Sequence, residues 1–169
     1  MRGSFFIGLM VLLAACSQTA PQRPSQRKSE APRPDSAQLA LLELNQHLTE
    51  VADSQLASIA RSEDASYALY ERGTWAAIIK QGEGEAVQPK EECTLHIRAY
   101  SLSGTLYTDT EQTARIGAQQ LPPAIEENIT EWKHGAQLML LAPWYAAYGI
   151  KGTEHIPPYE NLRIELTIQ

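Results

Sequence analysis

The stretch that decides the fold lies near the C-terminus, where Pro143 to Tyr159 reads PWYAAYGIKGTEHIPPY and Asn161 to Ile168 reads NLRIELTI. The first segment combines large aromatic rings with glycines and prolines, a composition typical of an ordered loop. The second alternates apolar and polar residues with a period of two, which predicts a half-buried strand. So many rings beside a strand indicate that the loop has a packing or binding role of its own.

Three further segments upstream have the composition of strands. They are residues 74–81, 93–100 and 136–142, the last of them apolar enough for a more fully buried strand. Turn-forming residues fill 81–89 and 101–107. One short helix is predicted at 123–132, with proline in its first turn, where a missing N–H is tolerated. Residues 73–169 therefore predict one α+β domain, an antiparallel sheet with a single short helix.

The N-terminus has the pattern of an export signal. Arg2 precedes an apolar run from Phe5 to Leu13, which is too short to cross a bilayer, and small residues then lead to Cys16. The sequence LAAC, Leu13 to Cys16, resembles the lipobox of bacterial lipoproteins. That resemblance implies a signal peptide at 1–15, a lipid on Cys16, and a membrane-bound protein. Because Ser17 is not acidic, it further implies the outer membrane, with the protein facing the periplasm.

Two segments link this signal to the sheet domain. Residues 16–34 are rich in proline, serine, glutamine and arginine and show no apolar periodicity, so they predict a disordered tether. In residues 35–61, leucine, valine and isoleucine recur along one imperfect helical face, and Asp35 or Ser36 can cap the start. We expect an accessory helical segment at 35–72. Its apolar face needs a partner: the sheet domain, a second copy forming a homodimer, or a client protein.

Charge and cysteine content exclude several classes of function. The formal net charge is −6, which argues against nucleic acid or an anionic lipid surface as a partner. If Cys16 carries a lipid, Cys93 is the one remaining thiol; it is either a small buried hydrophobe or pairs between molecules. The histidines share no ligand spacing with one another or with Cys93, so the sequence predicts no metal and no cofactor. These histidines are His47, His96, His134 and His155.

The C-terminal domain resembles the FKBP-type peptidyl-prolyl cis-trans isomerases. The segments that carry the resemblance are AYG at Ala147 to Gly149, IPP at Ile156 to Pro158, and the final strand at Asn161 to Ile168. Looser likenesses are GEG at 82–84, LSGTLYTDT at 102–110 and IEENITEWKHGAQLMLLAP at 125–143. The tether and helix before the domain are similar to those of bacterial lipoprotein FKBPs. The resemblance implies an FKBP-like antiparallel sheet wrapped on one short helix, preceded by the accessory helix.

The resemblance also implies an activity, rotation of the X–Pro peptide bond. Its barrier is about 18–20 kcal/mol, because rotation breaks the amide resonance. Such a site has to bind the twisted amide more tightly than the planar one, without a covalent intermediate. The substrates implied are proline-containing unfolded or exported proteins.

The site residues are carried over from the family position by position. Tyr148 matches the family's tyrosine whose hydroxyl donates to a substrate carbonyl. Tyr107 matches a residue in the wall of the proline pocket, and Ile125 matches the residue at the floor of that pocket. The substrate-binding set is completed by Ile97, Thr108, Leu121, Pro122, Ile156 and Ile164. From the residues alone, Ile97, Tyr107 and Ile164 fit a core role equally well.

Two departures from the family keep a second function open. Thr108 replaces an aspartate, and Pro122 stands where the family has a backbone N–H that proline lacks. Either the chain is an isomerase that assists the folding of exported proteins, or it is a chaperone or scaffold with the same fold and a weakened or inactive pocket.

Overall fold

The computed structural model describes residues 35–169. The signal peptide predicted at 1–15, the tether predicted at 16–34 and the lipidation site predicted at Cys16 lie outside these residues. Within 35–169, no helix is both long enough and apolar enough to cross a membrane.

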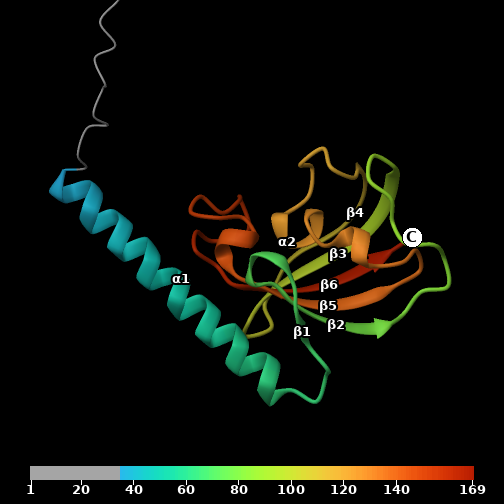
Figure 1. Ribbon diagram of the computed structural model, residues 1–169, viewed down its shortest axis with the longest axis horizontal. Helices are drawn as coiled ribbons and strands as arrows, with labels where there is room; N and C mark the ends of the chain where they lie inside the picture. Colours follow the sequence, from blue (N-terminus) through green and yellow to red (C-terminus); the bar gives the residue numbers. More distant parts are fainter. Residues whose placement is uncertain (1–34) are drawn as a thin grey trace, which may run out of the picture. The chain divides into compact units, whose positions relative to one another are not determined.

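The described chain begins with a long helix, α1, at Ser36–Ser62. Its start is fixed by a capping box, in which the Asp35 carboxylate accepts from the Gln38 N–H at 2.8 Å and the Gln38 side chain accepts from the Asp35 N–H at 3.1 Å. The buried residues of α1 are Ala52, Leu56 and Ala60, all in its second half. The first half extends away from the sheet (Figure 1). The helix predicted at 35–61 is therefore confirmed within one residue at each end.

Six antiparallel strands form one sheet in the order β1-β2-β5-β6-β3-β4 (Figure 1). The strands are β1 (Ala68–Leu69), β2 (Trp75–Lys80), β3 (Glu92–Ser101), β4 (Leu106–Arg115), β5 (Gln137–Ala142) and β6 (Leu162–Ile168). A short helix, α2, at Pro123–Glu126 is followed by a 3₁₀ helix at Ile129–Glu131. The predicted α+β class, with an antiparallel sheet, one short helix and a preceding long helix, is confirmed.

The neighbouring strands β3 and β6 show the alternation that the sequence predicts. On β6, Leu162, Ile164, Leu166 and Ile168 are buried, and the residues between them are half-buried. On β3 every second residue from Cys93 to Ser101 is buried in the same way. The inward residues of the two strands form one core with Ile125, Ile129 and Trp132 from the segment 123–132. This core lies beneath the loops that carry the predicted site residues.

The sequence analysis missed β4. It assigned 101–107 to a turn and named no strand in 106–115, which the structure shows as a ten-residue strand paired along its length with β3. The physical reason is that β4 is an edge strand with most of its side chains exposed, so LYTDTEQTAR lacks the apolar alternation of a half-buried strand. Its threonines, which favour strands, were the available signal.

The short helix predicted at 123–132 is also interrupted. Asn128, only 1% exposed, lies between α2 and the 3₁₀ helix, with a φ of −114°. Its side chain donates to the Ala124 carbonyl at 3.0 Å and accepts from the Glu71 N–H at 3.0 Å. An asparagine that bonds the local backbone in this way competes with helix continuation.

A second, smaller core forms where α1 meets the sheet. Leu56 and Ala60 pack with Leu141 of β5, and Trp75, Tyr67 and Leu102 border them. Leu56, Ala60 and strand β1 come before Gly73, where the sequence analysis placed the start of the domain, yet they contact or pair with residues after it. The boundary at Gly73 stays a prediction, and its test is described in the Discussion.

Candidate functional site

A cavity of about 290 Å³ opens between β3, β4 and two loops. It is lined from three parts of the chain: the strands, the segment that enters α2, and the loop after β5. The lining residues are Ile97, Thr110, Gln112, Gln119, Gln120, Leu121, Pro122, Pro123, Ala147 and Tyr148. All ten carry apolar side chains, amides or hydroxyls, and none has a side chain that is charged at neutral pH. The cavity can therefore bind a neutral, partly apolar group.

The floor on the sheet side follows from the pairing of β3 with β4. Ile97, which is 2% exposed, lies opposite Thr110. Because side chains alternate along a strand, Thr108, Thr110 and Gln112 share the face of β4 on which Ile97 lies in β3. The alternation of β4 therefore brings two polar side chains, Thr110 and Gln112, against an aliphatic floor.

The loop before α2 is held by one carboxylate. Glu126 accepts backbone N–H bonds from Gly117 at 2.7 Å, Gln119 at 3.2 Å and Leu121 at 3.1 Å. These bonds fix the backbone that presents Gln119, Gln120 and Leu121 to the cavity. Three N–H donors on one carboxylate are a strong arrangement, because hydrogen bonds to charged groups exceed neutral ones in strength.

The loop after β5 is built by its own backbone and by ring packing. Gly149 donates to the Trp144 carbonyl at 2.8 Å, and Tyr159 donates to the Gly149 carbonyl at 3.1 Å. At Gly152, with φ +61°, a β-carbon would lie 2.2 Å from the Ile156 carbonyl oxygen, so only glycine fits. The ring centroids of Trp144 and Tyr159 lie 4.9 Å apart. Most of the aromatic residues of this segment therefore pack the loop itself.

Tyr148 is the aromatic residue of this loop that lines the cavity. Its side chain is half-buried, and burial raises the pKa of its hydroxyl above the ordinary value. The hydroxyl therefore stays protonated at neutral pH. Among residues 35–169, the structure gives this hydroxyl no hydrogen-bond partner, in contrast to Tyr107, whose hydroxyl donates to Glu160 at 3.1 Å. A half-buried, unpartnered O–H at a cavity is available to a ligand carbonyl.

The same loop is bonded to α1 on its far side. The Tyr145 hydroxyl donates to Asp53 at 2.5 Å, and burial is the main cause that raises the pKa of Tyr145. Asn161 donates to Gln55 at 3.0 Å, and its side-chain oxygen accepts from the Trp144 N–H at 2.9 Å. The long helix is thus connected through Tyr145 to the loop in which Tyr148 lies three residues further on.

The predicted site residues fall into three groups. Ile97, Leu121, Pro122 and Tyr148 line the cavity. Ile125, Ile156 and Ile164, exposed by 0%, 3% and 0%, lie in the core below it, and the Tyr107 ring packs against that core. Thr108 is half-buried on β4 opposite Ala99 and does not line the cavity. The structure thus brings the first four residues together and places the other five beneath or beside them.

Sequence reasoning did not find Thr110, Gln112, Gln119, Gln120, Pro123 and Ala147. The two β4 residues were missed because β4 was not predicted as a strand; their period-two spacing from Thr108 was the available signal. The glutamines come from a loop whose path depends on Glu126, and no local pattern reveals that contact.

Comparison with protein families gives one match. Residues 83–169 match the family described as FKBP-type peptidyl-prolyl cis-trans isomerase. A comparison with curated proteins gives no match.

Solved structures share the fold at low sequence identity. A peptidyl-prolyl cis-trans isomerase from Pseudomonas syringae pv. tomato has a TM-score of 0.61 and 17% identity over 71% of this chain and 92% of its own. FkpA from Escherichia coli has a TM-score of 0.61 and 19% identity over 79% of this chain, and the match spans 63% of FkpA. The N-terminal domain of FKBP42 from Arabidopsis thaliana has a TM-score of 0.56 and 22% identity over 63% of this chain and 91% of that domain. The likeness is one of fold, and it confirms the predicted FKBP-like sheet.

Proposed function

Because this chain belongs to the FKBP-type peptidyl-prolyl cis-trans isomerase family, we propose that its cavity binds a proline residue and catalyses rotation of the X–Pro bond. The reaction needs no nucleophile and no proton transfer. It needs a site that binds the twisted amide more tightly than the planar one, because only such differential binding lowers the barrier. An uncharged cavity of this size suits a proline ring and its flanking carbonyls.

Each lining group has a part in this mechanism. Ile97 and Leu121, both nearly buried, offer the proline ring an apolar surface from which water is excluded. The Tyr148 hydroxyl donates to a carbonyl that flanks the proline and so restrains one side of the rotating bond. Glu126 holds the backbone of the opposite rim in place. The single observation that carries the proposal is the Tyr148 hydroxyl, which has no hydrogen-bond partner within residues 35–169, at an uncharged cavity of the family fold.

The experiment that tests the proposal compares two tyrosine variants. Tyr148→Phe removes only the donor, and we expect catalytic efficiency on a proline peptide to fall roughly two- to twelvefold, which corresponds to about 0.5–1.5 kcal/mol of transition-state stabilisation. Tyr100→Phe is the matched control, because its hydroxyl donates to Glu165 at 3.3 Å on the outward face of β3. A protease-coupled assay measures both. Activity that is indifferent to Tyr148→Phe, or equally reduced in both variants, would contradict the assignment.

One observation favours the second candidate, a binding module that does not turn over its ligand. Pro122 lines the cavity without a backbone N–H, and a missing hydrogen bond costs about 0.5–1.5 kcal/mol net. We expect Pro122→Ile to raise catalytic efficiency by up to about tenfold, because it restores a donor at the rim. If wild type shows no turnover and Pro122→Ile gains none, while proline peptides still bind, the chain is a binding module.

We also propose a location and substrates, from the sequence at Leu13 to Cys16. The chain is a lipoprotein, anchored through Cys16 to the outer membrane and facing the periplasm, where it assists the folding of exported proline-containing proteins. Cys16→Ala is expected to abolish incorporation of labelled fatty acid and partition into the detergent phase. Unchanged labelling would rule out the anchor without affecting the isomerase proposal.

A further inference from the structure

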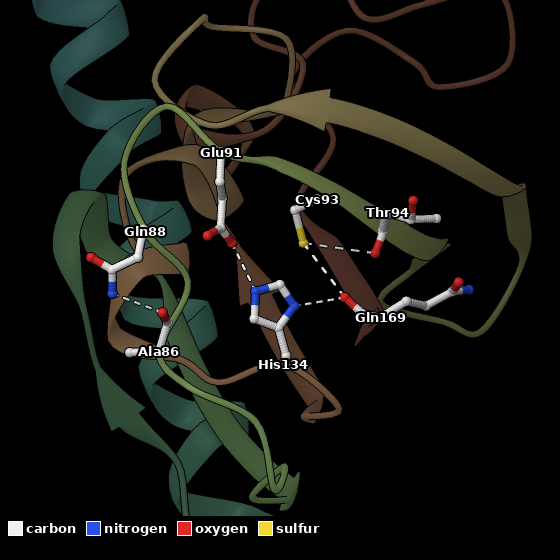
Figure 2. Close-up of polar contacts among 7 residues, drawn as sticks. All are labelled: Ala86, Gln88, Glu91, Cys93, Thr94, His134 and Gln169. Carbon is white, nitrogen blue, oxygen red and sulfur yellow. Dashed lines mark hydrogen bonds and ion pairs between the residues drawn. The ribbon is translucent and has the colours of Figure 1, made fainter.

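Three potential metal ligands, none of which lines the cavity, meet at the start of β3. Glu91 precedes the strand, Cys93 lies in it, and His134 lies in the turn before β5 (Figure 2). One ligand atom from each lies within 4.8 Å of the other two. The sequence predicted no metal because these residues share no motif spacing; only the fold brings them together.

The histidine is oriented as a metal ligand would be. His134 Nδ1 lies 2.7 Å from the Gln169 main-chain oxygen, which can only accept, so Nδ1 carries a proton. Metal-ligating histidines typically donate their second ring N–H to a backbone carbonyl in this way, which fixes the tautomer. The other nitrogen, Nε2, then faces Glu91 Oε1 at 2.8 Å. Two acceptors this close need a proton or a metal cation between them.

The thiol completes a third corner of the cluster. Cys93 is 1% exposed, and its Sγ lies 3.8 Å from the Thr94 carbonyl and 3.9 Å from that of Gln169. The Glu91 and His134 side chains are 28% and 32% exposed, so the cluster is open to solvent on that side. An ion could therefore enter past Glu91 and His134, and a water molecule could supply a fourth ligand.

The backbone around the cluster is fixed. His134 N donates to the Glu85 carbonyl at 3.0 Å, and the His134 carbonyl accepts from Gly84 N at 3.1 Å. A β-carbon on Gly84 would lie 2.6 Å from the His134 β-carbon, so the GEG turn packs directly on the histidine. On the strand side, Gln169 N donates to the Thr94 carbonyl at 2.9 Å. Only side-chain adjustment is needed to bind an ion.

We propose that Glu91, Cys93 and His134 bind a divalent transition-metal ion of the zinc class, with water as the fourth ligand. Zinc bonds of about 2.0–2.3 Å place tetrahedral ligand atoms roughly 3.3–3.7 Å apart, which small movements of the partly exposed Glu91 and His134 can reach. A thiolate and a carboxylate neutralise the 2+ charge, and the thiol proton leaves to solvent on binding. The mixed sulfur, nitrogen and oxygen donors favour zinc over magnesium or calcium. The bound ion would link the start of β3 to the turn before β5.

A proton on Nε2 would fill the same gap and give a His134–Glu91 ion pair without metal. The experiment that distinguishes a bound metal ion from this ion pair uses Co²⁺ as a spectroscopic substitute for zinc. It is carried out on the full chain without a polyhistidine tag. Cys16→Ser in this background leaves Cys93 as the one thiol of the chain. We expect one Co²⁺ per chain, a thiolate-to-cobalt charge-transfer band, and displacement by one equivalent of Zn²⁺.

The variants assign the ligands. Cys93→Ala should abolish the charge-transfer band, and Glu91→Gln and His134→Gln should each weaken binding at least tenfold. His96→Gln is the matched control. His96 lies on β3, as Cys93 does, and contacts Asp109 of β4 at 2.6 Å, but it is not one of the three clustered ligands. Circular dichroism checks that each variant is folded.

A second measurement needs no variant in the cluster: Zn²⁺ should slow alkylation of Cys93 and raise the melting temperature. Absence of stoichiometric binding, or binding that survives Cys93→Ala, would overturn the proposal and leave the ion pair. Neither result bears on the isomerase activity.

Discussion

At the scale of single residues, one carboxylate controls the rim of the cavity. Glu126 follows Ile125 on α2, so the residue that fills the core also places the carboxylate under the loop 117–121. Its acceptor oxygens satisfy three N–H groups that would otherwise need water. Removing the carboxylate would leave the N–H donors without a partner. The loss of folding free energy is then larger than the net contribution of the hydrogen bonds in the intact protein.

We expect Glu126→Gln to lower the free energy of unfolding by about 1–3 kcal/mol, because an amide offers one acceptor oxygen where the carboxylate offers two. Catalytic efficiency should fall together with stability, since the loop presents Gln119, Gln120 and Leu121 to the cavity. Urea unfolding and the peptide assay measure the two effects.

Glu127→Gln is the control for this prediction. Glu127 is the next residue and pairs with Arg72 on the surface at 2.6 Å, so little change is expected. If both variants behave alike, Glu126 does not hold the loop.

At the scale of elements, α1 has two halves with different roles. The second half is packed through Leu56, which is 0% exposed, and is bonded through Asp53, Gln55 and Glu63. Glu63 and Arg163 form an ion pair at 2.5 Å, and the Arg163 hydrogen bond is the main cause that lowers the pKa of Glu63. The partners in these contacts lie on β6 and its preceding residue and on the loop that carries Tyr148. The helix is therefore positioned to support that loop.

Leu56→Ala should lower the free energy of unfolding by about 2–5 kcal/mol, because it leaves a cavity in the smaller core. Leu106→Ala, at a site 49% exposed on β4, is the control and should change stability little. Removing residues 35–72 altogether tests the boundary at Gly73. The boundary predicts that residues 73–169 stay folded without the helix but lose any self-association. Unfolding of the shortened chain would show that the boundary at Gly73 is wrong.

Asp53→Asn tests the connection between α1 and the loop of Tyr148 with a smaller change than Leu56→Ala or removal of the helix. The amide oxygen still accepts from Tyr145, but without the charge, so fold stability should change by less than about 2 kcal/mol. If α1 supports the loop, catalytic efficiency should fall while unfolding stays nearly unchanged. Unchanged efficiency would mean that the loop holds Tyr148 without the helix.

At the scale of the whole molecule, the first half of α1 leaves an apolar surface exposed. Leu39, Leu41, Leu42 and Leu44 are each 47–55% exposed. Clustered exposed leucines on one helix typically mark an interaction surface. We propose that a second copy covers it, which gives a homodimer through the helix.

The dimer proposal predicts a concentration-dependent mass in sedimentation velocity, for the chain with Cys16→Ser to prevent lipidation. Leu41→Glu with Leu44→Glu should give a monomer, because the charges cannot be buried without a partner. Leu106→Glu, at a site 49% exposed on β4, is the control and should leave the mass unchanged. If the protein is a monomer at all concentrations, the homodimer proposal is wrong and the exposed surface is assigned to binding a client protein.

The sequence by itself determined the elements whose burial is periodic. The alternation in β3 and β6, the N-cap of α1, and the glycine and proline positions of the loop 143–159 are local signals, because each reflects what one residue needs from its immediate neighbours. From these alone the α+β class, the long helix and four of the six strands follow. The family resemblance added Ile97, Leu121, Pro122 and Tyr148, which the structure places around one cavity.

Only the tertiary structure decided what depends on contacts distant in sequence. The edge strand β4 buries too little to show a pattern, and β1 is two residues long. Glu126 reaches back to Gly117, Asp53 meets Tyr145, and His134 meets Glu91 and Cys93 only after the sheet has formed. Such meetings are set by strand order and register, which fix which residues face each other. Periodicity specifies which side of an element is buried, and the folded chain specifies what lies against it.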